Sequence, residues 1–213
     1  TQILFQYFSF SKNDLPNSFI RGCAFTGATL ISLALFSSAI FKWFPKTADY
    51  WRFRRYCGVS GFSFIFGHVL GVLYIVKFDL SLIYFSLNPF QNPIIFGSIG
   101  FSIFLPMALT STDWAVDKLT HKWWKRLHRL VYIAYLSAIF HFVSINPIAL
   151  KTPPGYLLLG ITTLALFGQL FWFFKTAKVA KFCSLGTLIG FLIITAAIIT
   201  GYVVYTHYFL PTP

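Results

Sequence analysis

The chain has 213 residues, of which 57% are hydrophobic and only 10% are charged. Soluble domains carry about 25% charged residues, so the composition excludes an ordinary soluble domain and predicts an integral membrane protein. The net charge is +12, but the basic residues cluster in short segments between apolar runs, as topology signals do. We therefore expect membrane lipid as a partner and no nucleic acid, because no soluble basic face exists to carry nucleic-acid binding.

Six apolar stretches reach or approach the roughly 20 residues that a membrane-crossing helix needs. They predict an all-α integral membrane bundle of about six transmembrane helices, which forms a single domain over residues 1–213. The segment Gln2–Phe10 is apolar but too short to cross, so we expect it to lie at the interface or to end another helix. The expected spans are Phe19–Phe41, Cys57–Val76, Pro93–Leu109, Leu127–Ile145, Gly155–Phe174 and Leu185–Phe209.

Lys and Arg alternate between the segments that connect these spans. Only the segments after the first, third and fifth spans are rich in them. By the positive-inside rule those segments face the cytoplasm, and both ends of the six-helix unit then face outward. The basic residues are Lys42, Lys46, Arg52, Arg54 and Arg55, then Lys118, Lys122, Lys125, Arg126 and Arg129, then Lys175, Lys178 and Lys181.

Two histidines stand at matched depth inside the apolar runs. His68 follows Arg55 by 13 residues and His141 follows Arg126 by 15 residues. At 1.5 Å per helical residue both lie about 20 Å from the basic end of their spans. Histidine in a membrane span is costly, rare and usually functional, and two helices can hold a haem iron from both sides. The sequence therefore predicts His68 and His141 as the axial pair of one b-type haem.

A third histidine, His128, lies near the start of the same span as His141. Arg54 and Arg55, not a histidine, occupy its level on the second span. Thirteen residues at about 100° each leave His128 and His141 roughly 140° apart around a straight helix, so both face inward only if the helix bends. Two interpretations of His128 stay open. It is either a ligand of a second haem or part of a solvated basic face.

The residues give less support to other kinds of site. A zinc site would need three or four convergent ligands, and no Ser-His-Asp set can be argued. We expect Cys23, Cys57 and Cys183 to be small buried residues. We expect His121 on a loop surface and His207 at the interface near the outer end. The sequence has no GxGxxG or GxxxxGK[ST] motif, so any NAD(P)H-oxidising module is expected on another chain.

Part of the chain resembles the MsrQ (YedZ) family, the haem-binding membrane subunits of bacterial protein-methionine-sulfoxide reductase systems. The family shows LTST at a span end, then W-x-x-L-H-R-L-V-Y, then a histidine 13 positions after the first; these correspond to Leu109–Thr112, Trp124–Tyr132 and His141. The stretch Arg54–Asp79 is similar to the family's earlier span, which carries a single histidine. The family belongs to the wider ferric-reductase-like transmembrane superfamily, where histidines on two helices hold one or two haems.

The resemblance implies an electron-transfer subunit of an oxidoreductase system in the bacterial inner membrane. It implies haem b at His68, His141 and His128, as one haem or two. It also leaves open FMN as a further cofactor. Electrons would pass from a cytoplasmic flavin reductase or quinol to a periplasmic molybdenum-containing methionine sulfoxide reductase. The main alternative is a ferric or other metal reductase that acts without a molybdoenzyme partner, and a non-redox membrane scaffold is the third class.

Overall fold

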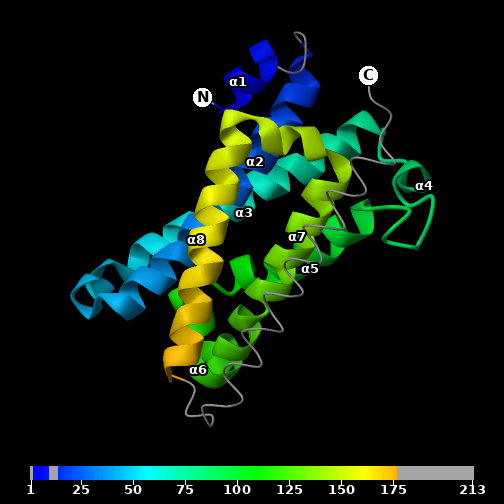
Figure 1. Ribbon diagram of the computed structural model, residues 1–213. Coiled ribbons are helices and arrows are strands. Elements are labelled where there is room, and N and C mark those ends of the chain that lie inside the picture. The colour runs from blue at the N-terminus through cyan, green and yellow to red at the C-terminus, as the bar shows by residue number, and fades with distance from the viewer. Residues whose placement is uncertain (1, 10–13, 177–213) are drawn as a thin grey trace. The chain divides into compact units, whose positions relative to one another are not determined.

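In the computed structural model, residues 2–9 and 14–176 are described, and every regular element among them is a helix (Figure 1). The predicted all-α membrane fold is thereby confirmed. The chain divides into two compact units, Thr1–Gln169 and Leu170–Pro213, and the first unit contains His68, His128 and His141. The sixth expected span, Leu185–Phe209, lies outside the described residues, together with Cys183 and His207.

Among the described residues, three segments are long and apolar enough to cross a membrane, namely α2, α3 and the consecutive helices α6 and α7, while α5 is a shorter apolar helix. Four of the first five expected spans each coincide with one helix, and the fourth, Leu127–Ile145, covers the end of α6 and all of α7. The elements are α1 (Gln2–Ser9), α2 (Leu15–Trp43), η1 (Pro45–Tyr50), α3 (Trp51–Ile75), α4 (Leu80–Ile83), α5 (Ile94–Leu109), α6 (Asp113–Arg129), α7 (Val131–Ile145), η2 (Pro147–Lys151) and α8 (Pro153–Thr176).

The expectation of a loop after the third span is wrong, because α6 occupies most of that segment. Thr112 caps this helix by accepting a hydrogen bond from the backbone N–H of Ala115. His121 therefore lies on a helix, although it is exposed as expected. A search for long apolar windows misses such a helix because charged residues alternate with Trp and Leu along it, as in amphipathic interfacial helices. It departs from helical geometry at Thr120 and ends before Leu130, and α7 begins directly after that residue.

Small residues let the helices approach closely, which is usual for helices in membranes. The helices α2 and α3 run antiparallel, with Gly27 facing Gly61. A Cβ atom on Gly61 would lie 2.8 Å from Ile31 Cγ1 and 3.1 Å from the Gly27 carbonyl oxygen. Similarly, α5 meets α7 at Gly100, where a Cβ atom would lie 3.0 Å from the carbonyl oxygen of Ala134.

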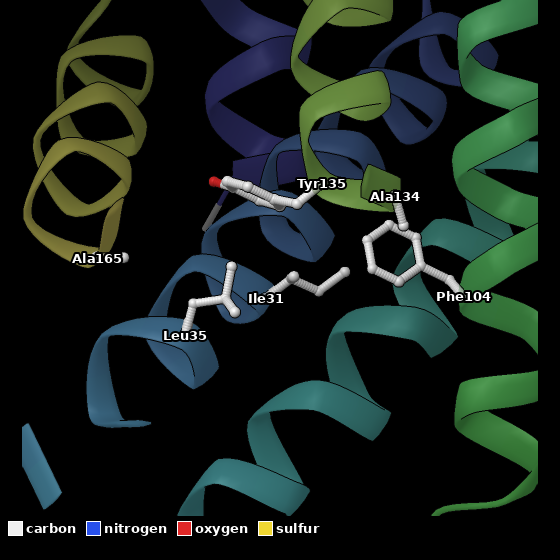
Figure 2. Close-up of a cluster of buried hydrophobic side chains, with 6 residues drawn as sticks. All are labelled: Ile31, Leu35, Phe104, Ala134, Tyr135 and Ala165. Atoms are coloured by element: carbon white, nitrogen blue, oxygen red, sulfur yellow. The ribbon is translucent and has the colours of Figure 1, made fainter. Parts of the chain in front are cut away.

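A cluster of buried side chains joins α2, α5, α7 and α8 (Figure 2). The ring of Tyr135 extends from α7 toward α8, with its hydroxyl directed away from Phe104. This core fixes the level of α7 against its neighbours, and α7 carries one of the two predicted haem ligands. The cluster consists of Ile31, Leu35, Phe104, Ala134, Tyr135 and Ala165.

We predict that Gly61→Ala destabilises the protein by about 1–3 kcal/mol, because overpacking a tight contact has that cost. Gly58→Ala on the same helix is the matched control, since a Cβ atom at Gly58 would meet nothing within 4 Å. Both changes raise helix propensity equally, so thermal unfolding in detergent isolates the packing cost. Equal melting temperatures for the two variants would contradict the close approach of α2 and α3.

Candidate functional site

The two histidines predicted at one depth are close together in space. His68 on α3 and His141 on α7 have ring centres 6.4 Å apart, with an angle of 71° between the ring planes. Both side chains are half-buried. The fold thus places two imidazoles from distant parts of the chain side by side among apolar helices.

Each of these imidazoles is held through one nitrogen by a backbone carbonyl. His68 Nδ1 lies 3.0 Å from the carbonyl oxygen of Ile20, and His141 Nδ1 lies 3.0 Å from that of Pro93. A carbonyl oxygen only accepts hydrogen bonds, so Nδ1 carries the proton in both rings and Nε2 is left as the nitrogen with a free lone pair. Histidines that bind metal usually donate their second ring nitrogen to a carbonyl or carboxylate in this way.

The distance between the two rings suits a shared metal ion. A metal–imidazole bond is about 2 Å long, and the bonded nitrogen lies about 1.1 Å from the ring centre, so two imidazoles on opposite sides of one ion have centres about 6 Å apart. The observed 6.4 Å agrees with that separation. The residues present therefore fit a group whose metal is bound from two sides.

Two glycines make room for this arrangement. A Cβ atom on Gly97 of α5 would lie 2.9 Å from His141 Nδ1, and a Cβ atom on Gly71 of α3 would lie 2.6 Å from Ile20 Cγ1. A larger residue at Gly97 would displace the imidazole, and one at Gly71 would push α3 away from the carbonyl that His68 uses. Both hydrogen bonds therefore require glycine at these two positions, because a side chain there would collide with His141 or with Ile20.

His128 lies elsewhere, at the end of α6. Its ring stacks on Trp124 with centres 4.0 Å apart, and its Nδ1 lies 3.1 Å from the Trp124 carbonyl oxygen. Its Nε2 is 3.4 Å from Ser111 Oγ. The side chain is half-buried, which disfavours the interpretation as part of a freely solvated basic face.

His128 lines a cavity of about 720 Å³ between α2, α3, α5, α6 and α7. The other histidine at this cavity among the described residues is His121, on the same helix. One end of the cavity is closed by apolar core residues that include Ile31 and Phe104. Its lining carries one carboxylate, Asp113, which pairs with a neighbouring arginine, so positive charge is in excess. The cations of the lining are Lys42, Arg54, Arg55, Lys125 and Arg129.

A buried group of hydroxyls, which the sequence did not predict, separates the two histidine levels. The Tyr135 hydroxyl contacts Ser32 Oγ and lies 2.6 Å from Thr162 Oγ1. Along the chain Tyr135 stands almost midway between His128 and His141. Polar side chains within three apolar spans were a signal for such a cluster, but their pairing depends on the register of α2, α7 and α8, which the sequence does not reveal.

The apolar helices are those of a membrane domain, and comparison agrees. The family described as the ferric reductase like transmembrane component matches residues 23–139, more than half of the chain. The chain belongs to this family. The match includes His68 and His128 and ends two residues before His141.

Individual curated relatives give a more specific resemblance than the family match does. The chain is 32% identical over 116 residues to the protein-methionine-sulfoxide reductase heme-binding subunit MsrQ of Caulobacter vibrioides, covering 53% of this chain and 52% of that protein. It is 34% identical over 94 residues to MsrQ of Agrobacterium fabrum, covering 43% and 42%. The magnetosome protein MamZ of Magnetospirillum gryphiswaldense is 31% identical over 93 residues, covering 43% of this chain and 14% of that protein.

These comparisons confirm the resemblance to MsrQ that the LTST and W-x-x-L-H-R-L-V-Y motifs indicated. The chain spans about half the length of the MsrQ relatives it matches. No solved structure matches it.

We predict that Tyr135→Phe lowers the free energy of unfolding by about 1–3 kcal/mol, the usual cost of leaving buried polar partners without a bond. Thermal unfolding in detergent measures the change. Tyr156→Phe is the control, because that side chain is 62% exposed. If both variants melt alike, the hydroxyl cluster does not stabilise the helix contacts.

Proposed function

We propose that this chain is a b-type cytochrome that carries single electrons across the bacterial inner membrane, with His68 and His141 as the axial ligands of one haem. The observation that carries the proposal is the pair of imidazoles 6.4 Å apart, each with Nδ1 bonded to a carbonyl. Further support comes from relatives that are named as heme-binding subunits.

The protein's own groups account for how such a site would work. The two imidazoles come from different helices, and the carbonyls of Ile20 and Pro93 fix the position and the tautomer of each ring. His68 and His141 would hold the haem, which would supply a one-electron iron couple. Phe101 of α5 stacks on Phe62 and Phe66 of α3, which adds an apolar contact between these two helices.

The distribution of charge supports a direction of transfer from the cytoplasm outward. Under the positive-inside rule, the cavity with its arginines and lysines faces the cytoplasm and the histidine pair lies in the outer half of the membrane. The exposed cations of α6 would dock an acidic flavin reductase, or a quinol would donate from the membrane. The acceptor would be a periplasmic molybdenum-containing methionine sulfoxide reductase, by analogy with the system that the relatives' name states.

The cavity beside His128 is the place for a second cofactor. Its 720 Å³ lies within the range of about 300–1,000 Å³ for small-molecule sites. Excess positive charge favours an anionic occupant, and Trp124 offers a flat ring next to His128. FMN and the propionates of a second haem both meet this description. A second haem would have His128 as its protein ligand, with Arg54 and Arg55 on the neighbouring helix.

We predict that His68→Ala and His141→Ala each abolish the low-spin haem spectrum, because each removes one axial ligand. His128→Ala should leave most of it. Absorbance and EPR spectra of the purified variants check this, with unfolding temperature as the control for folding. Complete loss of haem in His128→Ala, together with retention in His141→Ala, would show that the pairing is wrong.

The rate of haem reoxidation distinguishes the two possible acceptors. Supplied with reduced flavin on the cytoplasmic side, the haem should become reduced and then reoxidise only slowly, since no metal position is open to oxygen or substrate. Stopped-flow absorbance should show fast reoxidation when the methionine sulfoxide reductase and a sulfoxide are added. Rapid reoxidation by a ferric chelate and none by that enzyme would favour the metal reductase instead.

A further inference from the structure

The carbonyl that holds His141 belongs to the connection between α3 and α5. That connection ends at Asn92 and Pro93, directly before α5. Asn92 is the largest side chain in the described part of the chain that is fully buried, with 0% of its surface exposed. A buried amide is tolerated only when its donors and acceptor are bonded, so its partners indicate what it does.

Asn92 ties three parts of the connection together. Its Nδ2 donates to the Ile83 carbonyl at 2.8 Å, at the end of α4, and to the Ser86 carbonyl at 3.2 Å. Its Oδ1 accepts from the backbone N–H of Ile94 at 3.3 Å, the first residue of α5. The amide thus fixes the chain on both sides of Pro93.

Pro93 passes this restraint to the histidine. Its ring limits rotation about φ, and φ is −61° here, at the N-cap of α5. Its carbonyl oxygen accepts from the Phe96 N–H at 3.1 Å and lies 3.0 Å from His141 Nδ1. The direction of that carbonyl therefore depends on how Asn92 holds the connection.

The two histidines differ in this respect. The carbonyl that holds His68 belongs to Ile20, in the interior of α2, where the helix itself orients it. The carbonyl that holds His141 stands at a helix start, where one turn bond from the Phe96 N–H and the Asn92 side chain beside it hold the backbone.

We infer that Asn92 is the positioning residue of His141, acting through the Pro93 carbonyl, and that it sets the electron-donating strength of this ligand. The inference rests on the proposed haem site. A hydrogen bond from Nδ1 makes the imidazole a more basic ligand, which favours ferric over ferrous iron. Loss of Asn92 weakens that bond, so the reduced form becomes easier to reach.

The test is a redox titration of the haem-loaded chain with Asn92→Ala. At a fixed solution potential, the ratio of reduced to oxidised haem should rise by roughly tenfold, the lower end of the effects on metal affinity or activity seen when a metal ligand loses its hydrogen-bonding partner. The EPR g values of the ferric haem should shift as well, because the imidazole rotates. A purely structural loosening away from His141 would move neither readout.

Asn88→Ala is the matched control, since Asn88 lies in the same connection and its Oδ1 caps only the Phe90 N–H at 3.0 Å. Asn92→Ser keeps one donor and should give a smaller shift in the same direction; it takes the place of Asn92→Ala if that variant binds no haem. A potential and g values equal to those of Asn88→Ala would overturn the inference. A wild-type chain without a low-spin haem spectrum would overturn the proposed function instead.

Discussion

The arrangement of the site depends on the hydrogen bond between each half-buried imidazole and a backbone carbonyl. In an apolar bundle a ring N–H without a partner costs about 1–3 kcal/mol, so both bonds fix where the rings lie as well as which nitrogen stays free. One carbonyl, that of Ile20, comes from a helix interior, and the other, that of Pro93, from a helix start. The helices α2 and α5 are therefore part of the site although neither contributes a histidine.

Close packing of the helices brings each histidine within hydrogen-bonding distance of its carbonyl. Gly27 and Gly61 bring α2 against α3, and Gly97 lets α5 pass the ring of His141. Within a membrane, lipid is as apolar as the helix surfaces, so contact between small residues and a few buried polar bonds must hold the bundle together. The hydroxyls of Ser32, Tyr135 and Thr162 supply such bonds between α2, α7 and α8. Fold stability and the geometry of the histidine pair thus come from the same contacts.

The sequence was sufficient for the class and for the shared depth of His68 and His141, because helix rise and the position of basic residues give depth along a span. The sequence did not predict which groups hold the two histidines in place. The partners of His68 and His141 are main-chain atoms whose identity depends on the register between helices, and Asn92 is one polar residue among several in its connection. The helix α6 was missed because its alternating charged and aromatic residues do not form an apolar window. His128 and His141 lie on separate helices, α6 and α7, which the sequence pattern did not distinguish from one continuous span.

The two histidine levels have different electrostatic surroundings. Around His68 and His141 the neighbours are mainly apolar, whereas the cavity beside His128 is lined by cations. Lys42 is fixed there by Gln169 Oε1 at 2.7 Å, and Gln169 Nε2 is itself bonded to the Leu35 carbonyl at 2.9 Å. An amide partner leaves the local charge of Lys42 uncancelled, whereas a carboxylate partner would cancel it. The cavity lining therefore carries net positive charge. An anionic occupant at this level would offset the repulsion among these cations.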